Sequence, residues 1–365
     1  MKNTIGTSVA LTLFGESHGE YIGAVLDGLA PGIDVDEEYV SHCLSQRRPS
    51  GDISTARSEP DEYEIVSGVC GGKTTGAPIC ILIPNKNARP SDYEKTGFIP
   101  RPSHADFSAR EKYHGFEDIR GGGHFSGRLT APVVAAGAVV RSALKRNGII
   151  IGTHIKRLAG VDDRAFADIS GDISYLESAS FPALDPDAGE KMINKIKAAR
   201  DDGDSVGGVL ECAVLGVPAG VGEPWFYGVE SALSRALFAI PAVKGVEFGA
   251  GFKMSDMRGS EANDAYRFDG EKVFTKSNNN GGVLGGITTG MPILFSVAIK
   301  PTPSIFKEQE SVDLSTMENV SLSLSGRHDP AIVHRARAVV DAVASVVVAD
   351  LLALRYGTDF IGGAK

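Results

Sequence analysis

The sequence contains little cysteine, four residues in a chain of 365. None of the four forms a C-x-x-C pair or stands at a spacing from histidine that suits zinc, which argues against a disulfide framework and a structural metal site. No apolar run is long enough to span a membrane. The N-terminal apolar stretch is interrupted by threonine and serine and precedes no signal cleavage site. We therefore expect a cytoplasmic protein with reduced thiols and no metal ion.

The sequence also lacks an excess of positive charge. It carries 37 Lys and Arg against 46 Asp and Glu, a formal net charge of −9, which argues against nucleic acid or a membrane surface as partners. Positive charge is instead local, because eight arginines and four lysines lie within residues 46–130. Several of these arginines stand beside proline or glycine, and their planar guanidinium groups suit carboxylates and phosphates. The segment predicts a site for a small anionic ligand, with a solvated positive face as the alternative.

Two distant segments of the chain are similar to each other. Residues 71–79 read GGKTTGAPI and residues 285–293 read GGITTGMPI. Each is followed downstream by Ser-Gly-Arg and by a long apolar helix that we expect to begin at a proline and to end before a glycine, over 132–147 and 330–356. Both helices are apolar on nearly all sides, so we expect them to be buried. The echo predicts two pseudosymmetric halves within a single domain, residues 1–365, with chance similarity as the alternative.

Outside these helices the dominant pattern is alternation of apolar and polar residues. It predicts strands in segments such as SVALTLFG, YEIVSGV and PILFSVAIK, whereas residues 36–47, 187–200 and 228–239 have amphipathic helical patterns. Strands and helices do not follow a regular βαβ rhythm. We therefore expect the α+β class with antiparallel sheets.

Residues 14–19, FGESHG, match the G-x-S-x-G pattern that presents a nucleophilic serine in α/β-hydrolases. That motif requires a helix directly after the serine, whereas this chain continues with GEYIGAVLDGLAPG, which has the pattern of a second strand. The pattern favours a tight turn between two strands, with His18 instead of Ser17 as the candidate for chemistry. A non-catalytic anion-binding protein that uses the same arginines is a further alternative.

Ordered motifs along almost the whole chain resemble those of one family, the chorismate synthases. The motifs are FGESHG, RRPSG, RPSHADFSAREKYHGFEDIRGGG, SGRLTA, FAIPAVKGVEFGAGF, GSEANDAY, NNNGGVLGGITTGMPI, KPTPSI and GRHDP. The chain departs from the family pattern at His124-Phe125, where many members have arginine and serine. It also departs at Ser103, where glycine is commoner, and at Asp341, which replaces a frequent glutamate.

The resemblance implies a carbon–oxygen lyase of the shikimate pathway, the route of aromatic amino acid biosynthesis. Its reaction would be the 1,4-anti elimination of phosphate from 5-enolpyruvylshikimate-3-phosphate to give chorismate, with reduced FMN as cofactor and no net redox change. It further implies a β-α-β sandwich, in which antiparallel sheets flank long buried helices with an internal pseudo-twofold repeat, assembled as a homotetramer. Some members reduce their flavin with NADPH and others depend on an external flavin reductase or reductant. The sequence has no nicotinamide fingerprint, which favours the external reductant.

The resemblance also assigns roles by position in the matching motifs. His18 would donate a proton or hydrogen bond to the leaving phosphate, and His104 would lie by the flavin pyrimidine edge and govern the charge of the reduced ring. Asp329 would help to accept the C6 proton through flavin N5, and from the residues alone it is also a helix N-cap before Pro330. The substrate anions would bind Arg48, Arg57, Arg101, Arg128 and Arg327. Flavin contacts would come from Ser126, Gly127, Arg128, Lys300, Ser304 and Arg327.

Overall fold

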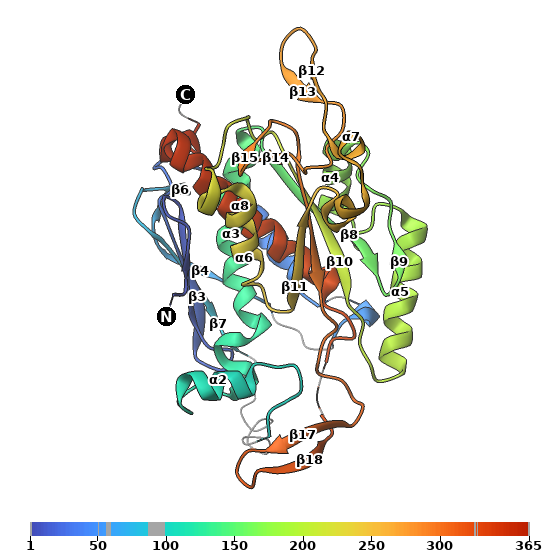
Figure 1. Cartoon of the computed structure of the whole chain (residues 1–365). Coiled ribbons are helices and arrows are strands. Elements are labelled where there is room, and N and C mark those ends of the chain that lie inside the picture. The colour runs from blue at the N-terminus through green and yellow to red at the C-terminus, as the bar shows by residue number, and fades with distance from the viewer. Residues whose placement is uncertain are drawn as a thin grey trace.

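The structure is a computed structural model, and it describes residues 2–49, 51–55, 60–86, 99–324, 326 and 328–363. Two residues expected at the site, Arg57 and Arg327, lie outside these ranges. Two five-stranded antiparallel sheets and the helices packed on them make up most of the described chain (Figure 1). Within those ranges, no helix is both long enough and apolar enough to cross a membrane.

The first sheet comes from the N-terminal quarter of the chain. Its strands pair antiparallel in the order β1 (Thr4–Ile5), β2 (Ala10–Gly15), β3 (Tyr21–Asp27), β7 (Ile79–Pro84) and β4 (Glu64–Ser67). Burial alternates along β7, where Ile79, Ile81 and Ile83 are buried and the residues between them are partly exposed. The β2–β3 hairpin carries the FGESHG turn at its end, as the sequence predicts.

The second sheet is formed by strands from the middle and the C-terminal part of the chain. Its antiparallel order is β11 (Val243–Phe248), β16 (Ile293–Ile299), β10 (Gly208–Leu215), β8 (Ile150–Leu158) and β9 (Val161–Asp162). The central strands β10 and β16 are mostly buried, because helices cover the sheet.

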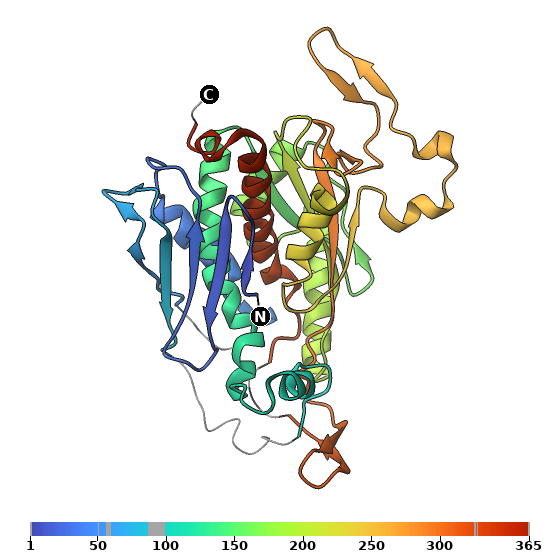
Figure 2. The ribbon, with the colours of Figure 1, turned by 60° about the vertical axis from the view of Figure 1, so that its left-hand side comes forward.

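The two apolar helices lie side by side between the sheets (Figure 2): α3 (Thr130–Arg146) and α8 (Val333–Tyr356). Helix α3 packs against β3 and β7, and α8 packs against β8 and β10, so both are buried along most of their length. They approach closely at Gly137, where a Cβ would collide with Ala342. The expected mixture of helices and antiparallel sheets is confirmed.

Further elements surround this core. Helix α1 (Glu37–Arg47) packs on α3 and α8, and α6 (Val229–Leu237) packs on α8. Helices α4 (Ile169–Ser178) and α5 (Pro186–Asp201) contact the β8–β9 side of the second sheet. The shorter elements are α2 (Asp106–Tyr113), α7 (Gly259–Ala262), and the hairpins β12 (Tyr266–Phe268) with β13 (Val273–Thr275) and β17 (Gln309–Asp313) with β18 (Glu318–Leu322).

The two similar segments have the same local structure. Each forms a short hairpin, β5 (Val69–Cys70) with β6 (Lys73–Thr74) and β14 (Val283–Leu284) with β15 (Ile287–Thr288), and each turns on two glycines with positive φ. Thr74 ends the first hairpin, and its hydroxyl donates to the carbonyl of Ala30 at 2.6 Å and accepts the N–H of Ile33 at 2.9 Å. Thr288 ends the second, and its hydroxyl donates to the carbonyl of Pro218 at 2.7 Å and accepts the N–H of Val221 at 2.9 Å. The two segments are therefore similar in hydrogen bonding as well as in sequence.

The start of α8 differs from the expectation. The helix begins at Val333 with Ile332 as its N-cap, so Pro330 is not the first helical residue and Asp329 does not cap the helix. The Asp329 carboxylate is engaged elsewhere, because it accepts the backbone N–H of Thr55 at 2.9 Å and pairs with Arg335 at 2.6 Å. These two partners satisfy the oxygens that a cap would have used.

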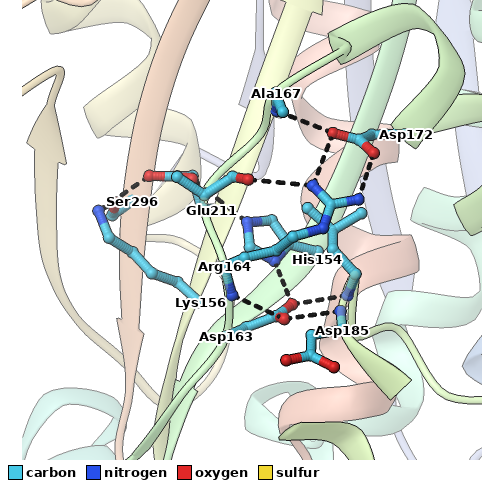
Figure 3. A network of polar contacts seen from close by, with 11 residues as sticks. His154, Lys156, Asp163, Arg164, Ala167, Asp172, Asp185, Glu211 and Ser296 are labelled. Carbon is cyan, nitrogen blue, oxygen red and sulfur yellow. Dashed lines mark hydrogen bonds and ion pairs between the residues drawn. The ribbon is translucent and has the colours of Figure 1, made fainter. Parts of the chain in front are cut away.

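A buried polar network joins β8 and β10 to the segments that lead into α4 and α5 (Figure 3). His154 is 0% exposed, and its Nδ1 and Nε2 lie 2.9 Å from Asp163 and 3.2 Å from Glu211. Burial alone would lower the pKa of His154, but hydrogen bonds to the two carboxylates outweigh it and raise that pKa above 6.5. Asp163 also accepts the N–H groups of Leu184 and Asp185, so the network anchors the start of α5.

We expect the contribution of His154 to stability to fall as pH rises above about 6.5, because the folded protein binds this proton more tightly than the unfolded chain does. A group whose pKa is raised by folding contributes fully below its unfolded pKa and loses that contribution as pH passes the folded pKa. Urea unfolding of the wild type and His154→Gln between about pH 6 and about pH 9 measures the effect. The difference in unfolding free energy should shrink with pH, and a constant difference would contradict a protonated His154.

Candidate active site

A cavity of about 1050 Å³ lies where the first sheet, the helices α3, α6 and α8, and the strand β11 meet. One wall is apolar and includes Val339, Val343, Val346 and Val347 of α8, whereas polar and cationic side chains line other parts. The lining brings together residues expected at the site from four separate motifs, namely His18, Arg101, His104, Ser126, Gly127, Lys300 and Ser304. Motifs that are far apart in the sequence thus converge on one cavity.

His18 lies on the turn between β2 and β3 and is 8% exposed. The N–H of Gly19 donates to the carbonyl of Glu16 at 3.1 Å and closes the turn. Ser17 is more deeply buried and is followed by β3. A nucleophile elbow needs a helix directly after the serine, so this geometry argues against the serine hydrolase alternative.

Three consecutive glycines, residues 121–123, bring a second loop against this turn. Their φ angles are 61°, 83° and 53°, a region that residues with a Cβ rarely adopt. A Cβ on the first of them would collide with the ring of His18, and a Cβ on the third would collide with the carbonyl of Asp118. Glycine is therefore required here for the close approach of two loops.

His104 is held in one tautomer. Its Nδ1 lies 3.1 Å from the carbonyl of Pro102, which can only accept, so Nδ1 carries the proton and Nε2 accepts the hydroxyl of Ser304 at 3.0 Å. Burial is the largest influence on its pKa and lowers it to about 4, so the ring is neutral at pH 7. Lys300 donates to the carbonyl of Ser103 at 2.6 Å, which joins the KPTPSI motif to the same segment.

Of the expected anion-binding arginines, the three that the structure describes, Arg48, Arg101 and Arg128, lie near acidic side chains. Arg101 forms a two-pronged ion pair with Asp106, with both N–O distances 2.8 Å. Asp61, 1% exposed, lies between Arg47 and Arg128, and Nε of Arg48 is 3.9 Å away. Neither Arg48 nor Arg128 is among the residues that line the cavity.

Asp61 and the arginines around it, Arg47, Arg48 and Arg128, form a charged cluster, which we call the Asp61 cluster. Burial would raise the pKa of Asp61, but Arg47 and Arg128 together hold it below its ordinary value. Nε of Arg128 donates to Oδ1 of Asn85 at 3.0 Å, so the cluster extends towards the His18 turn. Asp329 also lies outside the cavity lining, whereas its neighbour His328 belongs to it.

Several lining residues were not singled out from the sequence. They include Glu117, Arg235 and Lys244, whereas His124 was noted only as a departure from the family pattern. Among the described residues, Oε2 of Glu117 is buried without a hydrogen-bond partner. Lys244 belongs to the FAIPAVKGVEFGAGF motif, and Arg235 lies just before it. The match of that motif to the family pattern is the sequence signal that could have identified this part of the cavity wall.

The chain is similar to known proteins over almost its whole length. A family model described as "Chorismate synthase" matches residues 9–353. The chorismate synthase of Pyrococcus abyssi is 49% identical over 351 residues, which are 96% of this chain and 97% of the relative. That of Dehalococcoides mccartyi is 46% identical over 360 residues, 98% of each. A solved crystal structure of a chorismate synthase aligns with a TM-score of 0.74 at 29% identity, covering 96% of this chain and 94% of the other.

Proposed function

The chain belongs to the chorismate synthase family, and from this premise we propose that it removes phosphate from 5-enolpyruvylshikimate-3-phosphate by 1,4-anti elimination, with reduced FMN as cofactor. The family match over residues 9–353 carries the proposal. In this reaction the C–H bond at C6 and the C–O bond at C3 break, and a C=C bond forms. The proton passes to a base, the phosphate leaves with its electron pair, and no oxidant is consumed.

The cavity suits FMN together with the substrate. Its volume reaches the upper end of the range of about 300–1,000 Å³ that is typical of ligand pockets. The valines of α8 offer an apolar wall for a flat ring system, and Lys300, Arg235 and Lys244 offer positive charge for phosphate groups. The residues that would hold FMN are Ser126, Gly127, Lys300 and Ser304. When bound, reduced FMN supplies electron density while the C–O bond breaks.

His18 donates a proton or a hydrogen bond to the phosphate as it leaves. This role is supported by its place on the cavity lining and by its tightly held turn. The role of His104 beside the flavin remains a prediction. Its ring lines the cavity, and its Nε2 accepts the hydroxyl of Ser304 at 3.0 Å. We assign it the task of orienting the Ser304 hydroxyl.

Asp329 helps to accept the C6 proton in this proposal. The backbone N–H of Thr55 and the ion pair with Arg335 orient its side chain, and its chain neighbour His328 lines the cavity. Arg101 contributes to the binding of substrate anions, since its guanidinium lines the cavity while its pair with Asp106 fixes its direction. The corresponding roles of Arg48, Arg57, Arg128 and Arg327 remain predictions.

Anaerobic turnover of 5-enolpyruvylshikimate-3-phosphate with photoreduced FMN tests the proposal, with phosphate release and chorismate absorbance followed in parallel. We expect equal amounts of both products, and we expect none with oxidised FMN. Addition of NADPH in place of photoreduction tests the external reductant, because a chain that cannot reduce its own flavin should then stay inactive. A folded protein that binds FMN without turnover would contradict the function and leave the family assignment intact.

We further propose a cytoplasmic homotetramer with an internal pseudo-twofold repeat. The matching hairpins and threonine hydrogen bonds of the two similar segments support the repeat. Exposed aromatic side chains support assembly, because Trp225, Phe226 and Tyr227 are consecutive and all exposed. Single chains rarely leave such apolar surface in water.

Trp225 is the only tryptophan of the chain and is 83% exposed within a single subunit. If assembly covers it, we expect the fluorescence emission of the tetramer to be that of an apolar environment and to shift to the red when dilution dissociates the subunits. Emission spectra recorded along a dilution series, with size-exclusion chromatography at each concentration, measure this shift. Emission typical of a water-exposed indole at a concentration where the protein is tetrameric would contradict the assigned surface.

A further inference from the structure

We propose that Asn85 and His124 are positioning residues that hold the turn of residues 15–19, and with it His18, in place for the reaction. The effect on catalysis rests on the proposed function, whereas the geometry does not depend on it. Each of the two side chains contacts the backbone of the turn directly.

Asn85 bridges the turn across the histidine. It follows β7, and its Nδ2 lies 3.1 Å from the carbonyl oxygen of Glu16 and 2.9 Å from that of Gly19. These two carbonyls lie on either side of His18 in the chain. The backbone N–H of Asn85 also donates, to the carbonyl of Glu20 at 3.0 Å, so the anchor itself is fixed to the hairpin. One side chain thereby sets the separation of two carbonyls in the turn.

The orientation of the Asn85 amide is set by Arg128. Nε of Arg128 donates to Oδ1 of Asn85 at 3.0 Å, which leaves both Nδ2 hydrogens for the turn. Arg128 is itself held by Asp61, which Arg47 also binds. Arg128 thus helps to position the His18 turn through its hydrogen bond to Asn85, although it does not line the cavity.

His124 holds the other end of the turn. Its Nδ1 lies 2.8 Å from the carbonyl oxygen of Gly15, and because a carbonyl can only accept, Nδ1 carries the hydrogen. Beside it, the N–H of Ser17 donates to the carbonyl of Gly123 at 3.0 Å. The ring of His18 lies against Gly121, where any side chain would displace it.

Polar backbone groups throughout the turn are therefore bound to partners outside it. The carbonyls of residues 15, 16 and 19 and the N–H of residue 17 all have such partners, which come from Asn85 after β7 and from residues 123 and 124. A proton donor works only within hydrogen-bond reach of its acceptor, and a misplacement of about 1 Å costs up to about 100-fold in rate. Asn85 and His124 affect the distance between His18 and its acceptor without touching the reacting atoms.

Four single variants test the proposal: Asn85→Ala, His124→Ala, His124→Asn and, as the matched control, His114→Asn. We expect each alanine variant to lower kcat by about 10-fold to 100-fold with little change in KM. In His124→Asn the amide nitrogen takes the place of Nδ1 and can still donate to Gly15, so most of kcat should return. His114 is exposed and outside the cavity lining, and asparagine tolerates its φ of 58°, so its variant should match the wild type.

A second readout does not need turnover. In protein labelled with ¹³C at histidine Cε1, the His18 resonance, assigned by its loss in His18→Gln, should move or broaden in both alanine variants and keep its wild-type position in His124→Asn. An unchanged His18 resonance in both alanine variants would overturn the proposal. It would also be overturned if His124→Asn matched His124→Ala with a raised KM, since His124 would then contact ligand. If the wild type shows no turnover but the resonances behave as expected, the proposed function fails and the positioning role stands.

Discussion

His18→Ala should lower kcat by at least about 100-fold, the lower end of the contribution of a positioned proton donor. The leaving phosphate carries negative charge, and the C–O bond breaks more readily when a donor meets that charge as it develops. His18 is the lining histidine of the β2–β3 turn, and the turn is held by hydrogen bonds from two other segments. Removal of the ring deletes the donor and leaves the hydrogen bonds from Asn85 and His124 to the turn backbone available.

The measurement is anaerobic phosphate release with reduced FMN, combined with FMN binding by the same variant. Ser17→Ala is the matched control, because it alters the neighbouring residue of the same turn and should retain most of the activity. A loss in Ser17→Ala with activity kept in His18→Ala would reverse the assignment and revive the serine as nucleophile. Comparable losses in both variants would indicate that the turn, and not the imidazole, is what the reaction needs.

Asp61→Ala should destabilise the protein by about 3–5 kcal/mol, the usual cost of leaving a buried charge without its partner. The side chain of Asp61 is fully buried and pairs with two buried guanidinium groups, those of Arg47 and Arg128. The variant would keep both cations in an interior that screens charge poorly. The loosened Arg128 would also release Asn85, so we expect kcat to fall along with the melting temperature.

Urea unfolding of the variant gives the change in free energy, and Asp34→Ala is the matched control. Asp34 likewise pairs with two cations, Lys73 and Arg146, but its side chain is 55% exposed. Surface ion pairs contribute little because water screens them, so this variant should lose far less stability. Equal losses in the two variants would contradict the assignment of Asp61 as a buried anchor.

Much of the fold was predictable because its signals are local. Period-two alternation located β2, β4 and β16, and nearly unbroken apolar character located α3 and α8. The glycines after both long helices ended them as expected. The predicted start of α8 was wrong by three residues, because the Asp329 carboxylate binds Thr55 and Arg335 instead of capping the helix. Thr55 is remote in sequence, and Arg335 lies six residues further along within α8, so a local capping rule accounts for neither partner.

The candidate site was predictable as a set of residues and not as a set of contacts. Motif order pointed to His18, His104 and the arginine-rich segment, and the structure places both histidines on one cavity. No pattern indicated that Asp61 would be a shared partner of Arg47 and Arg128, nor that Asn85 would bridge the His18 turn. Each of these contacts joins segments that are separated by at least 14 residues.

By itself the sequence determined the strands and apolar helices, the turns that need glycine, and the motifs by which the family is recognised. These properties depend on neighbouring residues, so they can be read along the chain. Only the tertiary structure decided which charges meet, which histidine is neutral and which arginines are already paired. These outcomes depend on distance through space and on desolvation, as His104 shows, whose pKa of about 4 arises mainly from burial. The chemistry of a charged side chain is set by where the fold places it.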